Sequence, residues 1–426
     1  MATKRAGQRW VLDALVGQAG WDVLHPEARG IFYELGYFHS DINRVFSKVG
    51  STLHFSRAWL TTGQEVEKKA RWAEERGHRL AARDFYQRAA LLYGRGQYGF
   101  FGDDPRKSHF HDKMLQCFQK VIEYTPGVHI ERVILPFEGK DIYGVLYVPE
   151  GEGPFPCVLM GPGMDMIKED WHVGYMKYFL PRGFAALAID GPGQGETLLH
   201  GCKVTLDNYE RAASVFLDFL TERREIDSDR LVHYGVSMGS YWGCRLAAHD
   251  GRIKASATAM GCTSTMEVIF HHAQPNFKAN FMYMAGYQDE DAFDREIMQH
   301  MNLDGIVENV KCPLLMMHGE FDELTPLEAA LATYERAAKP KAMWVFGEEF
   351  HPLGGAGVDI LTLGADWLVA MMDGKYDPNM DDRLYFGRDG TIIKGDSRPP
   401  WWDGVLTPGR VDQRDGAAAT PASSRT

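Results

Sequence analysis

The sequence predicts an α/β protein in which a mostly parallel, eight-stranded sheet carries helices on both faces and follows a helical domain. From residue 128 to 373, short apolar runs alternate with amphipathic segments of helical period. This alternation is typical of a parallel sheet covered by helices. Residues 1–127 lack strand-like alternation, and their apolar residues recur at helical spacing.

The apolar runs define the expected strands, which are His129–Pro136, Ile142–Val148, Pro156–Met160, Phe184–Asp190, Arg230–Tyr234, Ala255–Met260, Pro313–His318 and Ala342–Phe346. The expected helices between and after them are Trp171–Leu180, Leu206–Glu222, Met238–His249, Pro326–Ala338 and Gly357–Met372. Only Glu138–Asp141 separates the first two strands, which predicts a hairpin and an antiparallel start to the sheet.

Three regions are expected along the chain: a helical domain over 1–127, an α/β domain over 128–373 and a C-terminal extension over 374–426. In the helical domain, Gln64–Tyr93 follows a helical period with a charged outer face. Residues 263–309 are polar and contain no clear strand, so we expect a lid-like insertion there. The end of the extension, Gly409–Thr426, is of low complexity, which predicts disorder.

The composition argues against several classes of protein. A net charge of −12 is unlike that of nucleic-acid-binding proteins, which usually carry a basic stripe. The chain has no apolar run of about 18 residues, so no transmembrane helix is expected, and its start lacks the apolar core of a secretory signal. The cysteines show no zinc or disulfide spacing, which predicts free thiols in a reducing cytoplasm; they are Cys117, Cys157, Cys202, Cys244, Cys262 and Cys312.

The motif Gly235-Val-Ser237-Met-Gly239 lies between an expected strand and an expected helix. In this strand–turn–helix context, GxSxG is the nucleophile elbow, and its glycines allow a sharp turn. The serine then stands at the carboxyl end of its strand. The helix that follows contributes positive potential for a developing oxyanion.

An acid and a histidine follow the serine in the chain order of a Ser–acid–His triad. Asp322 lies on the loop after the strand that ends at His318, and His351 lies on the loop after the next strand. Serine needs an imidazole to take its proton, and the carboxylate orients that imidazole. Glu320 and Glu323 compete with Asp322 as the acid, and we favour Asp322 because it lies in the middle of its loop.

Two glycine-rich loops follow early strands. In the loop Met160–Asp165, the backbone N–H of Met164, or that of its neighbour Gly163, is expected to form an oxyanion hole with the N–H of Met238. The second loop, Asp190–Glu196, does not match the spacing of a dinucleotide-binding motif. We interpret it as a structural loop near the pocket.

Five motifs occur in order: GPGMDMIKED, AIDGPGQGET, GVSMGSYWG, PLLMMHGEFDELTP and EEFHP. Together they resemble the α/β-hydrolase superfamily, and more narrowly the branch of the FrsA-like proteins, 2,6-dihydroxypseudooxynicotine hydrolase and the fungal polyketide-shortening hydrolases of melanin biosynthesis. The resemblance covers residues 128–373 well and the helical region more loosely. It implies an α/β-hydrolase fold with an N-terminal helical cap domain. One departure is Ser240, where many relatives carry glycine, and this concerns local packing.

The resemblance also implies an activity. Members of this branch hydrolyse carbon–carbon bonds next to ketones, or esters, and need no cofactor. Their catalytic residues carry over onto Ser237, Asp322 and His351. By spacing, a further acidic residue corresponds to Glu267, which would bind a substrate hydroxyl or adjust a protonation state; a charge on the lid surface is the alternative. A homodimer is expected from the resemblance alone.

The expected substrate is a small aromatic or ketone-bearing molecule. Asp165 and Gly163 belong to the predicted oxyanion loop, and Tyr241 or Trp242 follows the nucleophile closely enough to touch the pocket wall. The aromatic-rich stretches 32–38 and 93–101 either face this substrate or pack inside the cap.

The leading hypothesis is a serine hydrolase that cleaves a carbon–carbon bond next to a ketone, and the alternative is a carboxylic-ester hydrolase. A rival of another class is a non-catalytic ligand-binding or regulatory protein, whose usual mark is a lost Ser, His or acid. All three residue types are present. The pair His271–His272 has no carboxylate or cysteine partner at ligand spacing, so no metal site is predicted. A prolyl-oligopeptidase would need a propeller domain, which the helical N-terminal region does not supply.

Overall fold

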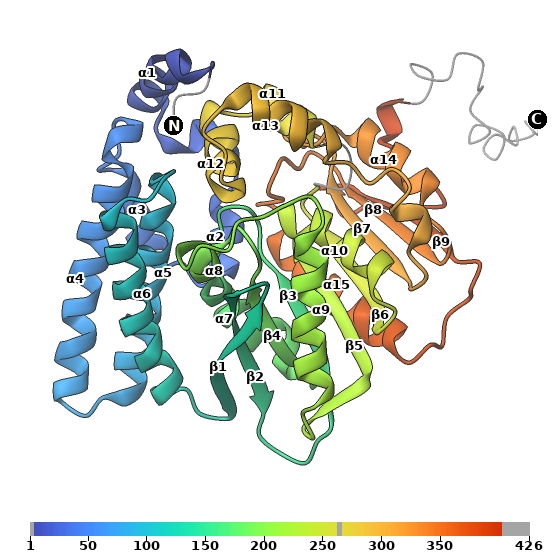
Figure 1. Ribbon diagram of the computed structural model, residues 1–426, viewed down its shortest axis with the longest axis horizontal. Helices are drawn as coiled ribbons and strands as arrows, with labels where there is room; N and C mark the ends of the chain where they lie inside the picture. The colour runs from blue at the N-terminus through green and yellow to red at the C-terminus, as the bar shows by residue number, and fades with distance from the viewer. Residues whose placement is uncertain (1–3, 262–265, 403–426) are drawn as a thin grey trace, which may run out of the picture.

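A computed structural model describes residues 4–261 and 266–402 of the chain (Figure 1). The chain forms one mixed sheet whose strands lie in the order β1-β2-β4-β3-β5-β6-β7-β8-β9-β10. The strands are β1 Val128–Phe137, β2 Lys140–Pro149, β3 Phe155–Gly161, β4 Ala185–Asp190, β5 Ile226–Val236, β6 Ile253–Ala259, β7 Leu314–Gly319, β8 Lys341–Phe346, β9 Asp381–Phe386 and β10 Ile392–Lys394. All eight predicted strands are present, within a few residues of their predicted ends.

The sheet begins antiparallel, as the sequence predicts. β1 pairs antiparallel with β2, and Phe137 lies opposite Lys140. The two residues between them, Glu138 and Gly139, have φ angles of 49° and 75°. Positive φ at both central positions is what a two-residue hairpin with the natural strand twist requires. From β4 through β3 to β9, all neighbouring strands are parallel.

Helices cover both faces of this sheet. The helices after β3 are α7 Trp171–Gly174, α8 Gly195–Leu199, α9 Asn208–Thr221, α10 Met238–His249, α14 Leu327–Arg336 and α15 Gly357–Met372. Buried residues of α9, α10 and α14 share one apolar core, and those of α7 and α15 share another. The two cores lie on opposite faces because successive side chains of a strand point to opposite sides.

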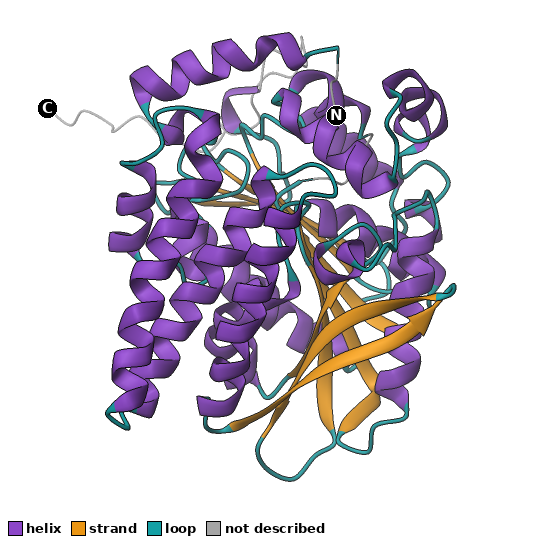
Figure 2. Ribbon diagram, turned by 60° about the vertical axis from the view of Figure 1, so that its left-hand side comes forward, coloured by secondary structure: helices purple, strands orange, loops and turns teal. Residues whose placement is uncertain are grey.

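The N-terminal region is helical, in α1 Arg9–Ala19, α2 Arg29–Glu34, α3 His39–Phe46, α4 Phe55–Glu75, α5 Arg79–Gly96 and α6 Pro105–Tyr124. The stretch Gln64–Tyr93, predicted to be helical, falls in two helices, α4 and α5, which pack against each other. The chain turns at Gly77, whose φ of 73° is left-handed. Figure 2 shows this bundle alongside the sheet, and its buried side chains join the core of α7 and α15.

The polar segment expected to be an insertion contains α11 Glu267–His272, α12 Pro275–Ala285 and α13 Glu290–Glu296, and its residues 263–265 fall outside the described part of the chain. These helices lie near α1 in Figure 1. Arg5 donates to the carbonyl oxygens of His271 and Ala273 at 2.7 and 2.6 Å. The Gln274 side chain donates to the Leu24 carbonyl oxygen at 3.0 Å. The insertion is therefore tied to the N-terminal region.

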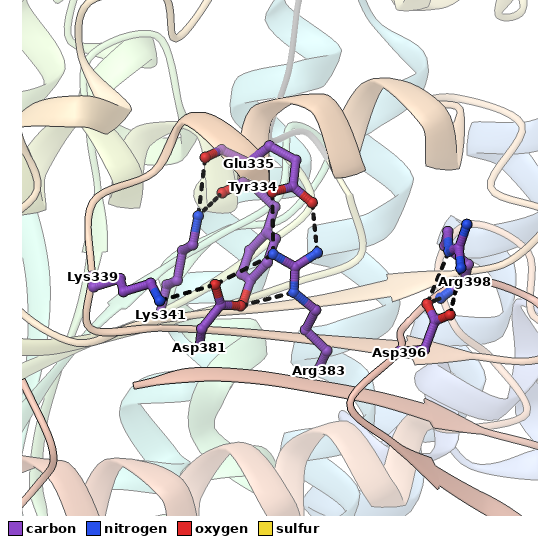
Figure 3. A network of polar contacts seen from close by, with 8 residues as sticks. All are labelled: Tyr334, Glu335, Lys339, Lys341, Asp381, Arg383, Asp396 and Arg398. Carbon is purple, nitrogen blue, oxygen red and sulfur yellow. Dashed lines mark hydrogen bonds and ion pairs between the residues drawn. The ribbon is translucent and has the colours of Figure 1, made fainter. Parts of the chain in front are cut away.

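The sheet is wider than predicted, because the C-terminal extension adds β9 and β10 beyond β8. These strands are short and half-polar, so they lack the apolar runs by which the other strands were recognised. Figure 3 shows how polar contacts attach β9 instead: Arg383 donates to Glu335 at 2.6 Å, and Tyr334 donates to Asp381 at 2.7 Å. The stretch 409–426, predicted to be disordered, lies outside the described residues.

The extension also supports two loops at the carboxyl ends of β7 and β8. The Tyr385 hydroxyl of β9 donates to Glu320 at 2.8 Å, and the Trp401 indole donates to the same carboxylate. Arg388, just after β9, bonds Glu349 at 3.1 Å and also pairs with Glu27 of the N-terminal region. The N-terminal region and the C-terminal extension therefore meet at these loops.

Two further features bear on the sequence predictions. Five cysteines are free and buried in the described residues: Cys117, Cys157, Cys202, Cys244 and Cys312. Cys262 lies outside that part of the chain. Among the described helices, none is both long enough and apolar enough to span a bilayer.

Candidate active site

The predicted nucleophile stands on a sharp turn between β5 and α10. Ser237 has φ 52° and ψ −119°, so its backbone lies in a region that non-glycine residues rarely adopt. Its N–H donates to the Ala259 carbonyl oxygen of β6 at 2.8 Å. The Ser240 hydroxyl donates to the same oxygen at 2.6 Å and is completely buried. The serine in place of a glycine thus ties the elbow to the neighbouring strand.

The glycines of the motif are required by close backbone approach. A Cβ on Gly239 would lie 2.2 Å from the Gly161 carbonyl oxygen at the end of β3. A Cβ on Gly235 would lie 2.3 Å from the carbonyl oxygen of Gly239 itself. Both distances are far below van der Waals contact, so only glycine lets α10 start this close to the sheet.

The three residues predicted to form a triad lie in hydrogen-bond contact. Ser237 Oγ is 3.0 Å from His351 Nε2, and His351 Nδ1 is 3.0 Å from Asp322 Oδ2. The other carboxylate oxygen of Asp322 accepts the N–H groups of Leu324 and Thr325 at 2.9 and 2.8 Å. His351 and Asp322 are buried, so both side chains are held in single orientations.

The electrostatics of this pair favour a charged carboxylate beside an imidazole that binds protons readily. Burial alone would raise the pKa of Asp322, but the charge and hydrogen bond of His351 outweigh it and hold the pKa below its ordinary value. Burial alone would lower the pKa of His351, but the charge and hydrogen bond of Asp322 raise it above its ordinary value.

The two glutamates that compete with Asp322 have other partners. Glu323 accepts the backbone N–H of His351 at 2.9 Å. Glu320 accepts the backbone N–H of Glu348 at 2.8 Å and the hydroxyl of Tyr385. Each glutamate therefore stabilises the loop of His351 by accepting one of its backbone N–H groups, while Asp322 contacts the imidazole. His318, at the end of β7, bonds the Thr325 carbonyl oxygen at 2.9 Å.

The predicted oxyanion loop runs beside the serine. A Cβ on Gly163 would lie 3.3 Å from Ser237 Cβ, so the loop backbone passes in contact with the nucleophile. Met164, Gly163 and Asp165 all line the cavity that contains Ser237. Met238 begins α10 and is buried directly after the serine.

The cavity over Ser237 and His351 is largely apolar. Five aromatic side chains line it: Trp21, Phe32, Phe46, Trp171 and Phe277. Four of these five come from outside the core of the α/β domain, three from the N-terminal region and one from α12. Of the two aromatic stretches noted in the sequence, the first contributes Phe32 and the second contributes no aromatic side chain to this wall but supplies Arg95.

Three predicted pocket residues do not line this cavity. Tyr241 is buried in α10, with its hydroxyl 3.4 Å from the Asn302 carbonyl oxygen. Trp242 stacks on Tyr209 with ring centroids 4.6 Å apart. Both point from α10 into the core, because the helix turns its next residues away from the serine. Glu267 is exposed on α11 and pairs with His271 at 3.5 Å, so it is a surface charge here.

Sequence reasoning missed the polar side chains that the N-terminal region brings to the cavity, notably His25 and Arg95. Their contact with the site depends on how the bundle packs, and no local pattern encodes that packing. As for metals, the described residues hold no group of three His, Cys, Asp or Glu side chains arranged as ligands.

The mixed sheet, the helices on both faces and the serine elbow define an α/β hydrolase. The chain belongs to the FrsA-like esterase family, whose model matches residues 53–331. It is thus related to esterases, among them the esterase FrsA of Escherichia fergusonii.

Individual relatives agree with this assignment. The chain is 30% identical over 280 residues to the α/β hydrolase xenA of Xenoacremonium sinensis, a match that spans 63% of this chain and 64%, just under two thirds, of that protein. It is 26% identical over 315 residues to the 2,6-dihydropseudooxynicotine hydrolase of Paenarthrobacter nicotinovorans, covering 74% of this chain and 83% of that one. The crystal structure of 2,6-dihydroxy-pseudo-oxynicotine hydrolase shares the fold, with a TM-score of 0.73 at 24% identity over 83% of this chain and 99% of that one.

Proposed function

We propose that this protein is a cofactor-independent serine hydrolase that cleaves the carbon–carbon bond next to a ketone in an aromatic or polyketide-like substrate. The observation that carries the proposal is the relay Ser237–His351–Asp322, with 3.0 Å at each step, at the floor of an aromatic-lined cavity. Residues 1–127 serve as the cap in this proposal, since they supply three of the five aromatic side chains of the wall.

In the proposed reaction, Ser237 Oγ attacks the ketone carbon while His351 Nε2 takes the hydroxyl proton. Asp322 stabilises the imidazolium that forms. The negative charge on the former carbonyl oxygen is held by the N–H groups of Met164 and Met238. When the tetrahedral intermediate collapses, the carbon–carbon bond breaks and the leaving carbanion or enolate takes the proton from His351. Water, deprotonated by the same imidazole, then releases the carboxylic acid and restores Ser237.

A carboxylic-ester hydrolase is the second candidate, and the esterase name of the family favours it. The same three residues serve both reactions, and only the leaving group differs. Carbon–carbon cleavage is supported by the aromatic wall and by the relative named for a pseudooxynicotine substrate. The buried free thiols support a reducing compartment such as the cytoplasm.

The test is intact mass after treatment with a fluorophosphonate, with wild type and Ser237→Ala side by side. We expect one adduct on wild type and none on the variant. No adduct on wild type would contradict the serine-hydrolase proposal and favour a binding protein. Turnover of aryl β-diketones against matched aryl esters then separates the two candidates, and faster turnover of esters would replace the first with the second.

A further inference from the structure

The side chain of Gln194 bridges two consecutive carbonyl groups of the predicted oxyanion loop. Its amide nitrogen lies 2.9 Å from the Gly163 oxygen and 3.3 Å from the Pro162 oxygen. Gln194 comes from the other glycine-rich loop, between β4 and α8, and is 2% exposed. Carbonyl oxygens only accept hydrogen bonds, so the group that faces them must be the NH₂ of the amide.

This bridge fixes the direction in which the Met164 N–H points. In a trans peptide, the C=O of one residue and the N–H of the next point in opposite directions. The Gly163 carbonyl and the Met164 N–H belong to one such unit. Because Gln194 holds the carbonyl on its own side, the Met164 N–H is directed away from Gln194. The Ser237 side chain lies against Gly163, since a Cβ added at Gly163 would lie 3.3 Å from Ser237 Cβ.

The loop that carries Gln194 is held in place by a buried ionic cluster. The Asp190 carboxylate accepts the backbone N–H of Glu196, two residues after Gln194, at 2.9 Å. It also accepts the backbone N–H and the ammonium group of Lys168, each at 2.9 Å. Lys168 follows the oxyanion loop, and both Lys168 and Asp190 are completely buried. One carboxylate therefore clamps the two glycine-rich loops together on either side of the Gln194 bridge.

We infer that Gln194 is a positioning residue that aims the Met164 N–H at the oxyanion, an inference that rests on the serine-hydrolase function proposed above. Without the amide, the Gly163 carbonyl would keep only the N–H of Met166, at 3.2 Å. The peptide between Gly163 and Met164 could then rotate its N–H away from the reacting oxygen. The bridge matters most in the transition state, when the carbonyl oxygen of the substrate becomes negatively charged.

The experiment compares Gln194→Met, which has similar length and no donor, and Gln194→Glu, whose oxygens repel both carbonyls. The matched control is Gln97→Met, because Gln97 is also buried and its side chain makes no hydrogen bond to the described residues. The readouts are kcat and KM for 4-nitrophenyl butyrate, the labelling rate of Ser237 by a fluorophosphonate, and Ki for an aryl trifluoromethyl ketone, which forms an oxyanion on the enzyme. End-point labelling counts the folded active sites.

We expect Gln194→Met to lower kcat roughly 10- to 100-fold at nearly constant KM, less than the roughly 10²- to 10³-fold loss when an oxyanion donor is removed outright. The affinity for the trifluoromethyl ketone and the labelling rate should fall in parallel, and Gln194→Glu should lose more. Gln97→Met should match wild type in all three.

A purely structural role would lower the melting temperature and the number of active sites but leave kcat per site unchanged, and that result would overturn the inference. Equal losses in Gln97→Met would overturn it too. If Gln194→Met does not fold, the same readouts are taken on Gln194→Asn. This variant keeps the amide, but its side chain is one carbon too short to reach the loop. No labelling of wild type would overturn the proposed function and this inference with it, whereas normal labelling with unchanged Gln194 variants would overturn the inference alone.

Discussion

Arg95 of α5 forms an ion pair of 2.5 Å with Asp165, the residue that follows Met164 in the predicted oxyanion loop. The guanidinium also lies over the ring of Phe32, 5.0 Å from its centroid. Both charged residues line the cavity over Ser237. The N-terminal helices therefore contact the predicted oxyanion loop directly, and a change in their packing would be transmitted to the loop backbone.

Replacement of Arg95 by Met should destabilise the fold by about 2 kcal/mol, because Asp165 would keep its charge in a mostly enclosed site. This is less than the roughly 3–5 kcal/mol expected for a fully buried pair, since a third of the Asp165 side chain is exposed. Urea denaturation measures the loss. Arg83→Met on the same helix is the control, because Arg83 pairs with an exposed aspartate and should cost under about 0.5 kcal/mol. An equal loss of unfolding free energy in both variants would show that the ion pair with Asp165 stabilises the fold no more than an exposed pair does.

Asp322→Asn should shift the acid limb of the pH–rate profile to lower pH. The base must be neutral to accept the serine proton, so activity rises with pH through the pKa of His351. Asp322 raises that pKa, and the amide would no longer do so. The rate constant itself should fall about 10⁴-fold, as for a triad that has lost its acid. The profile of kcat/KM between pH 5 and 9 measures both effects, and an acid limb that stays in place or moves upward would contradict the assignment.

Ser240→Ala should cost about 1 kcal/mol of stability, the usual net value of one hydrogen bond, and leave kcat within a few-fold of wild type. The hydroxyl is lost, but the Ala259 carbonyl oxygen still accepts the N–H of Ser237. Thermal denaturation and steady-state kinetics check the two parts. Ser47→Ala removes an exposed hydroxyl that bonds the Arg44 carbonyl oxygen and is the control with little expected change. A loss of kcat beyond about 10-fold would mean that Ser240 shapes the elbow itself.

Asp170→Asn should change how stability depends on pH. Burial raises the pKa of Asp170 to about 7, although the Ile167 N–H and the charge of Arg95 act against it. Between about pH 4 and 7 the folded carboxyl holds a proton that the unfolded one has lost. The contribution of Asp170 to stability therefore falls by about 1.4 kcal/mol per pH unit and levels off above pH 7.

The Asn variant lacks this titration. Relative to wild type it should therefore gain about 2–3 kcal/mol between pH 5 and pH 7.5, measured by urea denaturation. Asp112→Asn, at an exposed position of α6, should keep a constant difference from wild type. A constant difference for Asp170→Asn as well would show that this carboxyl is ionised in the folded protein.

The sequence predicted the strands well because β3, β4, β7 and β8 are largely apolar runs. It predicted α10 and α15 to the residue. It missed β9, which is held by the bonds of Arg383 and Asp381 to α14 and by pairing to β8, and no local pattern reveals these contacts. It also joined α4 and α5 into one segment, because a single glycine within a helical pattern does not specify whether the chain bends or reverses.

The same distinction holds at the candidate site. Ser237, Asp322 and His351 follow strands whose carboxyl ends meet at one edge, so order along the chain was enough to place them together. Glu267 was placed by spacing within a family resemblance and Trp242 by its proximity to Ser237, and the geometry of α11 and α10 turns them to solvent and to the core. Gln194 was set aside as structural, because its contact with Gly163 joins two loops that are far apart along the chain.

The support that β9 gives to the loops of Asp322 and His351 has a consequence for synthesis on the ribosome. The turn that presents Ser237 needs only strands that precede it and β6, so it can form early. Tyr385 and Arg388 support the loops of Asp322 and His351 through Glu320 and Glu349. Both residues emerge among the last described segments. We therefore expect a nascent chain to carry a folded but inert serine until β9 has left the exit tunnel.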